Sequence, residues 1–108
     1  MWICLNDGFL SAVEHKDAPD RLMVRARKLG HLVAVFGKDA KIIKSPPGSD
    51  YAYRISVSKK DFAEIITNRI MNLDYPNFKD SVKDNRLHNL YARWWLDHVK
   101  AFVKVEDK

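Results

Sequence analysis

Hydrophobic and polar positions alternate along the first quarter of the chain, which is typical of strands in a sheet with one buried face. Two short apolar runs, 2–5 and 9–14, flank Asn6-Asp7-Gly8, whose Asp-Gly dipeptide supplies the positive φ angles that a tight hairpin turn needs. After a loop over 16–20, the run 21–27 alternates again. One of its faces carries Leu22, Val24 and Ala26, and the other carries Arg21, Arg25 and Arg27. We predict a hairpin and a half-buried third strand with its arginines in water.

The middle of the chain predicts one short helix and two further strands. Apolar residues at 29, 32, 33 and 36 have helical spacing, and Gly37 follows as a C-cap. Residues 41–44 predict a strand that ends at Ser45-Pro46-Pro47-Gly48, a sequence unable to continue one. Residues 51–58 then alternate. The face expected to meet the core carries Tyr51, Tyr53, Ile55 and Val57.

The second half of the chain predicts helices. Ser58 and Asp61 resemble a capping box and precede apolar residues at helical spacing from Phe62 to Leu73. Tyr75-Pro76 predicts a restricted turn, after which Asn77 or Asp80 caps a short helical turn. A final helix begins near 83–84. Its apolar stripe holds Leu87, Leu90, Tyr91, Trp94, Trp95, His98 and Phe102, which favours a core position for His98.

The order of these elements is β-β-β-α-β-β-α-α, which indicates an α+β fold. We expect a mainly antiparallel sheet of about five strands, covered on one face by helices. A chain of 108 residues lies near the commonest domain size, so residues 1–103 are expected to form a single domain. The charged tail 104–108 is expected to fray.

Composition and cysteine content indicate the compartment. At 46% hydrophobic and 31% charged residues, the chain has the composition of a globular protein and not of a disordered one. Its single cysteine, Cys4, cannot form an internal disulfide. The opening MWICLNDGFL has no positive n-region, and Asn6 and Asp7 interrupt its apolar run. We therefore expect a cytoplasmic protein without membrane insertion, of an oligomeric state that the sequence does not indicate.

Positive charge is concentrated in one block. Residues 21–44 hold seven lysines and arginines against one aspartate, which gives 7 − 1 = +6 within a net charge of +5. Such a block is the electrostatic footprint of an anionic partner, or else the solvated face of a basic protein. The nucleic-acid hypothesis combines phosphate-neutralising cations with a tyrosine that stacks on bases, although both tyrosines share an apolar face. Its residues are Arg21, Arg25, Arg27, Lys28, Lys41, Lys44, Tyr51 and Tyr53.

Several classes of chemistry lack their motifs. The four histidines are at least ten residues apart, and no HxxxH, HExxH or CxxC spacing prepares a metal site. No glycine-rich phosphate loop and no GxSxG elbow occurs. We therefore expect no metal and no cofactor, and we disfavour nucleotide hydrolysis and serine hydrolase chemistry.

The stretch from Asp74 to Trp95 holds most of the side chains that a site would use. One turn separates Asp84 from His88, so the carboxylate is placed to orient the imidazole as a general base, with Lys79 or Arg86 binding an anion. The alternative is that Asp84 caps the helix while His88 lies at the edge of the stripe. We favour this alternative, so an enzyme is the less supported hypothesis.

Protein binding through this stretch is the favoured hypothesis. Adjacent helical residues diverge by about 100°, so Trp94 and Trp95 cannot both face the centre of the stripe. We expect Trp95 at an edge, where it anchors a partner. The predicted protein-binding residues are aromatic anchors and their polar neighbours: Tyr75, Asn77, Phe78, Lys79, Asp80, Arg86, His88, Tyr91 and Trp95.

Three segments carry a resemblance to other proteins: DYPNFKDSVKDNRLHNLY, the opening MWICLNDGFLSAVEH, and Ala52 to Arg54. Through them, residues from Met1 to about Trp94 resemble a group of small proteins of unknown function encoded by bacteria and bacteriophages. The resemblance implies a cytoplasmic, phage or prophage context and brings no established activity. The residues that carry it, and that it places in a shared site, are Tyr75, Asn77, Phe78, Lys79, Asp80, Arg86, His88 and Tyr91.

Overall fold

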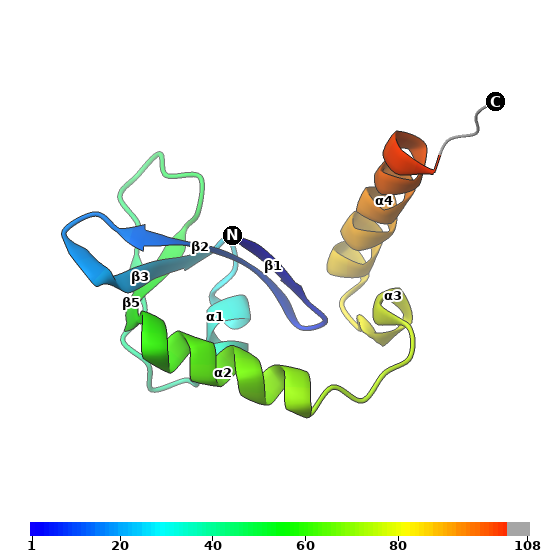
Figure 1. The fold of residues 1–108 in the computed structure, drawn as a ribbon. Helices are drawn as coiled ribbons and strands as arrows, with labels where there is room; N and C mark the ends of the chain where they lie inside the picture. Colours follow the sequence, from blue (N-terminus) through cyan, green and yellow to red (C-terminus); the bar gives the residue numbers. More distant parts are fainter. Residues whose placement is uncertain (104–108) are drawn as a thin grey trace. The chain divides into compact units, whose positions relative to one another are not determined.

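The computed structural model describes residues 1–103, so the predicted frayed tail over 104–108 lies outside the described residues. The strands form one antiparallel sheet in the order β1-β2-β3-β5-β4 (Figure 1). They are β1 (Trp2–Leu5), β2 (Gly8–His15), β3 (Ala18–Ala26), β4 (Ile43–Lys44) and β5 (Tyr53–Ser58). The helices are α1 (Leu29–Phe36), α2 (Lys59–Met71), α3 (Phe78–Ser81) and α4 (Asn85–Phe102). The predicted α+β class is confirmed, with α3 as a separate short helix.

The chain divides into two compact units. The first unit, Met1–Asp74, holds the sheet, α1 and α2, and the second begins at Tyr75 and holds α3 and α4. The expectation of a single domain over residues 1–103 stays a prediction.

Both α1 and α2 pack on one face of the sheet. The buried cluster beneath them consists of Leu10, Ala12, Val24, Ala26, Leu32, Ile55, Val57 and Phe62. Six of these eight residues alternate along β2, β3 and β5, so they line the same face of the sheet. Leu32 comes from α1 and Phe62 from α2, and the Phe62 ring stacks on Phe36 with centroids 5.9 Å apart. The predicted covering of one face by helices is confirmed for this unit.

The first hairpin forms as predicted, but the role of Gly8 in it differs from the predicted one. Leu5 pairs with Gly8, so the turn consists of Asn6 and Asp7. Gly8 is not at positive φ, since within residues 1–103 the positive φ values belong to Gly37 and Gly48. Our prediction of positive φ at the Asp-Gly dipeptide is therefore wrong.

The reason for glycine at position 8 is space. A Cβ there would lie 2.9 Å from Cβ of His31 in α1 and 3.0 Å from its Cα. The next amide, Phe9 N, donates to Nδ1 of the same histidine at 3.3 Å. Glycine thus lets the start of β2 approach α1 closely.

Helix ends follow local side-chain chemistry. The Ser58 hydroxyl accepts from Asp61 N at 3.0 Å and begins α2, and Gly37, at φ 89°, ends α1. Asn77 Oδ1 accepts from Asp80 N at 3.0 Å, and Asp84 Oδ1 accepts from Arg86 N at 3.1 Å. These bonds satisfy amide groups that the first turn of a helix leaves unpaired. The predicted caps at Ser58 and Gly37 are confirmed.

Strand boundaries differ from the predictions at three places. β3 begins at Ala18, because two residues suffice to turn the chain after β2. β4 is only two residues long, and β5 begins at Tyr53. Tyr51 therefore lies before the strand that was expected to contain it.

Candidate functional site

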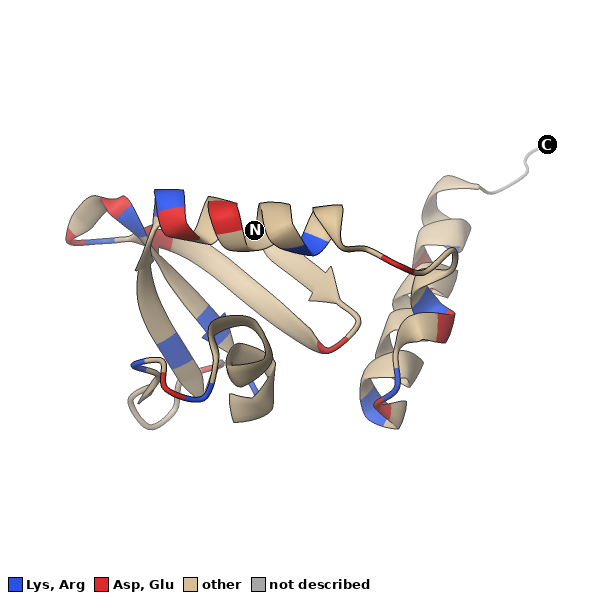
Figure 2. Ribbon diagram, turned by 90° about the horizontal axis from the view of Figure 1, so that it is seen from below, with Lys and Arg blue, Asp and Glu red and all other residues tan. Residues whose placement is uncertain are grey.

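The sheet face opposite the buried cluster carries arginines, and we call it the arginine face. Ser11, Arg25 and Arg54 are paired in register across β2, β3 and β5, and all three alternate with buried-cluster residues. Trp2 of β1 and Ile43 of β4 complete this row at the two edges of the sheet. Figure 2 shows bands of lysine and arginine on the strands, whereas α2 carries both signs of charge. The centre of this face is thus cationic.

Tyr51 belongs to the arginine face. The guanidinium carbons of Arg25 and Arg27 lie 4.6 and 4.3 Å from the centre of its ring. Our prediction that Tyr51 shares the face of Ile55 is wrong, because the chain bends at Tyr51 and enters the sheet only at Tyr53. The ring is 6% exposed, so it supports the arginines and has little surface on which a base could stack.

Arg21 and Arg25 of β3, and Arg27 just after the strand, have different partners. Arg27 Nη2 donates to both carboxylate oxygens of Asp50, at 3.0 and 3.1 Å. Arg21 Nε donates to the Ser56 hydroxyl at 2.9 Å, and Arg25 Nη2 to the Ser11 hydroxyl at 2.7 Å. The ion pairs found among residues 1–103 are Arg27–Asp50, Lys59–Glu14 and Arg69–Asp7. Arg21 and Arg25 therefore have hydroxyl partners, and neither they nor Arg54 has a carboxylate partner in the described part of the chain.

Two donors of this face are unsatisfied. Nε of Arg25 and Nε of Arg54 are both buried, and neither has a hydrogen-bond partner in the described part of the chain. Sequence reasoning missed Arg54. The alternation over 51–58 did indicate that Arg54 lies on the other face of the strand from Ile55. Its proximity to Arg25, however, depends on the register between β3 and β5.

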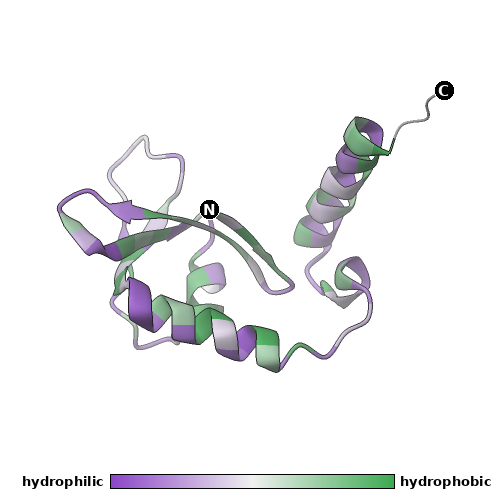
Figure 3. Cartoon of the chain, in the orientation of Figure 1, coloured by the Kyte–Doolittle hydropathy of each residue, from purple (hydrophilic) through white to green (hydrophobic). Residues whose placement is uncertain are grey.

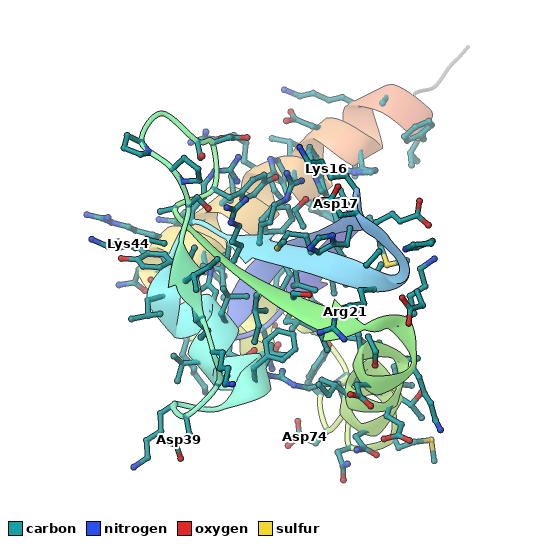
Figure 4. The ribbon with its side chains drawn as sticks, turned by 90° about the vertical axis from the view of Figure 1, so that its left-hand side faces the viewer. Lys16, Asp17, Arg21, Asp39, Lys44 and Asp74 are labelled. Carbon is teal, nitrogen blue, oxygen red and sulfur yellow. The ribbon has the colours of Figure 1, made fainter. Side chains whose placement is uncertain are left out.

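The other residues of the basic block lie elsewhere. Tyr53 packs against the buried cluster on the opposite face, and Lys28 precedes α1 as its N-cap. Lys44 lies in β4, which β5 separates from β3, and Lys41 is exposed before that strand. Figure 4 shows Lys44 well apart from Arg21. The predicted nucleic-acid-binding residues thus do not form one surface.

In the second unit, several predicted anchors form an aromatic cluster. Successive ring centroids of Tyr75, Phe78, Tyr91 and Trp94 lie 5.9, 5.1 and 5.9 Å apart. Tyr91 is only 4% exposed, so it is unsuited to contact a partner directly. The cluster joins α3 to α4. These aromatic residues have a structural role in the unit.

Trp95 differs from the other predicted aromatic anchors. Its side chain is 54% exposed, and Nζ of Lys79 lies 4.6 Å from the centre of its ring. Leu96 beside it is also exposed. The expected position of Trp95 at an edge is confirmed, and the structure brings Trp95 together with one predicted polar contact, Lys79.

Two of the predicted polar residues of this unit are helix caps. Asn77 caps α3. The Asp84 side chain caps α4 and so has the structural role that the sequence favoured. His88 Nδ1 lies 3.4 Å from Asn89 Oδ1, with no hydrogen bond to the Asp84 carboxylate among the described residues. The geometry therefore gives no support to an Asp84–His88 general base.

His98 is exposed, so its expected core position is wrong. It belongs to the last turns of α4, where hydrophobic and polar bands alternate along the helix (Figure 3). The four residues of α3 span about 6 Å, whereas the 18 residues of α4 span about 27 Å. α3 is therefore too short to cover the whole stripe of α4.

Two further properties of the described residues bear on function. No group of three or more histidine, cysteine, aspartate or glutamate side chains in residues 1–103 is arranged to hold a metal ion. No helix in that range combines the length and the apolar character needed to cross a bilayer. Comparison with known proteins adds no relative: no protein-family model, curated protein or solved structure matches the chain.

Proposed function

We propose that the chain is a non-catalytic interaction protein that binds another protein through the exposed side of α3 and α4. The observation that carries this proposal is Trp95, which is 54% exposed beside Lys79. Tryptophan, tyrosine and arginine are enriched among the residues that dominate binding energy in interfaces. Asp80 is exposed on α3 beside Lys79, and we assign it a polar contact of the proposed surface. Arg86 is exposed on α4, but it lies about half a turn of the helix away from Trp95 and so falls outside this surface.

The aromatic cluster supports this role indirectly. Tyr91 and Phe78 pack against one another, so the helices that carry Trp95 and Lys79 are joined before binding. The ammonium group of Lys79 further restrains the indole ring. A side chain that is held in place before binding loses less conformational freedom on association, which favours affinity.

The cellular setting belongs to the same proposal. A single cysteine without an internal disulfide partner favours the cytoplasm. The resemblance to bacterial and bacteriophage proteins supports a phage or prophage context, and we therefore expect the partner among bacterial host or phage proteins.

Affinity purification from the native cell, with and without nuclease, tests the proposal. Three tagged forms are compared by mass spectrometry: the wild type, Trp95→Ala, and Arg93→Ala as an exposed control on the same helix. We expect a nuclease-resistant protein that the wild type and the control retain and that Trp95→Ala loses. With the purified partner, loss of a dominant contact should weaken binding by roughly 30-fold, as measured by calorimetry.

The opposite results would exclude the proposed surface. If Trp95→Ala and Lys79→Ala both bind the partner as tightly as the wild type does, the exposed side of α3 and α4 is not the binding surface. A partner that disappears with nuclease would instead favour nucleic acid.

Nucleic-acid binding is the second candidate, and one observation favours it. The arginine face presents Arg21, Arg25 and Arg54 without carboxylate partners among residues 1–103. The set differs from the predicted one, because Arg27 is paired with Asp50 and Arg54 joins. Affinity for an oligonucleotide that barely changes with salt concentration would argue against this candidate, since phosphate contacts release counterions.

A further inference from the structure

Arg25 and Arg54 stand directly opposite one another in the antiparallel pair of β3 and β5. Directly opposed residues in such a pair have Cα atoms about 4.5–5.5 Å apart and side chains on the same face. Like charges in this arrangement repel each other and destabilise the sheet. Two opposed guanidinium groups therefore indicate that this pair of arginines has a role other than stabilising the sheet.

The hydrogen bonding of the two groups is incomplete. A guanidinium has five N–H donors, and buried donors normally find an acceptor. Arg25 Nη2 donates to the Ser11 hydroxyl, but its Nε, like Nε of Arg54, is buried and has no hydrogen-bond partner within residues 1–103. Arg27, which follows β3, occupies both carboxylate oxygens of Asp50. In the described part of the chain, neither guanidinium of the opposed pair thus has an anionic partner.

Arg25 is held in position by its surroundings. Ser11, which is 2% exposed, accepts its hydrogen bond at 2.7 Å, and the Tyr51 ring lies 4.6 Å from its guanidinium carbon. Arg25 and Arg54 are themselves only half-buried, so a ligand can reach their Nη groups although both Nε atoms are buried. The arrangement combines a fixed cation with a second cation beside it.

We propose that Arg25 and Arg54 together bind a phosphate group of an external ligand, with Ser11 and Tyr51 as positioning residues for Arg25. One carboxylate matches the fork of one guanidinium, whereas a phosphate offers oxygens in several directions and carries enough charge to engage two. The same chemistry is offered by inorganic phosphate, by a phosphomonoester and by the backbone of a single-stranded nucleic acid. The site does not depend on the protein-binding surface of α3 and α4.

Inorganic phosphate is the first probe, applied to the full chain labelled with ¹⁵N. We expect phosphate to shift the Nε–Hε NMR signals of Arg25 and Arg54 and to leave that of Arg93, on α4, unchanged. Sodium chloride of equal ionic strength separates this response from screening. If the two signals do not respond to phosphate, or if acetate shifts them as strongly, the proposal is overturned.

Variants locate the site independently. Arg54→Gln removes a cation that forms no ion pair within residues 1–103, and Arg93→Gln is the matched control. We expect Arg54→Gln to weaken phosphate binding about tenfold or more and Arg93→Gln to leave it unchanged. Unchanged binding by a folded Arg54→Gln chain would refute the site. The titration of the wild type keeps the test decisive even if a variant fails to fold.

A short single-stranded oligonucleotide then identifies the source of the phosphate. Binding at least about tenfold tighter than inorganic phosphate, in competition with it and weakened by Arg54→Gln, would assign the site to a nucleic-acid backbone. Phosphate binding without such oligonucleotide binding would assign it to a small phosphorylated ligand. The protein-binding proposal is tested separately, at Trp95. The failure of one proposal therefore does not decide the other.

Discussion

At the scale of single residues, the close approach at Gly8 leads to a specific prediction about stability. We expect Gly8→Ala to lower the free energy of unfolding by about 1–3 kcal/mol, because the added Cβ forces β2 and α1 apart. The methyl group would meet Cβ and the backbone Cα of His31 at 2.9 and 3.0 Å, and a backbone atom cannot rotate away. Urea denaturation followed by circular dichroism measures the change.

Gly30→Ala is the matched control for Gly8→Ala. Gly30 lies in α1, and a Cβ added there meets nothing within 4 Å. Alanine is the better helix former by about 1 kcal/mol, so this variant should be as stable as the wild type or more so. Equal stability of Gly8→Ala and the wild type would show that β2 and α1 can move apart without a loss of folding free energy.

The same scale shows which residue roles the sequence can predict. The caps at Ser58 and Gly37 were predicted correctly, because a cap depends on residues within one turn of the helix. Gly8, Tyr51 and Arg54 were misjudged or missed. Their roles depend on an approach between β2 and α1, a bend before β5, and the register of β3 with β5, and local patterns do not contain this information.

At the scale of elements, α2 is held to the sheet mainly by Phe62. Its side chain is buried within the cluster and stacks on Phe36 of α1. We expect Phe62→Ala to lower the free energy of unfolding by about 3–5 kcal/mol, since it removes a buried aromatic ring and leaves a cavity. Chemical denaturation of the purified variant provides the measurement.

Met71→Ala tests whether position on α2 decides the effect of Phe62→Ala. Met71 is the last residue of the same helix and is exposed, so its truncation should change stability by less than about 0.5 kcal/mol. Similar losses in both variants would mean that α2 is not anchored through Phe62.

Elements were predicted more accurately than their arrangement. Periodicity located the hairpin, α1, α2 and α4, because the spacing of apolar residues within each element indicates its buried face. The position of β5 between β3 and β4 was not predictable, since it depends on how the chain crosses after α1. For this reason the block 21–44, continuous in sequence, is divided between a face of the sheet, its edge and the start of α1.

At the scale of the whole molecule, the two proposed surfaces belong to different units. The arginine face lies in the unit Met1–Asp74, and Trp95 lies in the unit that begins at Tyr75. The buried cluster and the side chains packed on it are all drawn from residues 3–66. Every residue of this cluster therefore belongs to the first unit, which makes the expectation of a single domain testable by truncation.

We expect a chain that ends at Asp74 to keep the fold of the sheet, α1 and α2, because it retains every member of the buried cluster. The amide NMR signals of β3 and β5 should keep their dispersion, and their slow hydrogen exchange should persist. Stability should be modest, since a chain of this length buries a smaller fraction of its surface than a larger domain does. A truncated chain with collapsed dispersion and fast exchange would instead mean that residues after Asp74 are needed for the sheet to fold, as a single domain over residues 1–103 requires. If the fragment folds, phosphate binding at Arg25 and Arg54 should survive in it, because both arginines, Ser11 and Tyr51 remain.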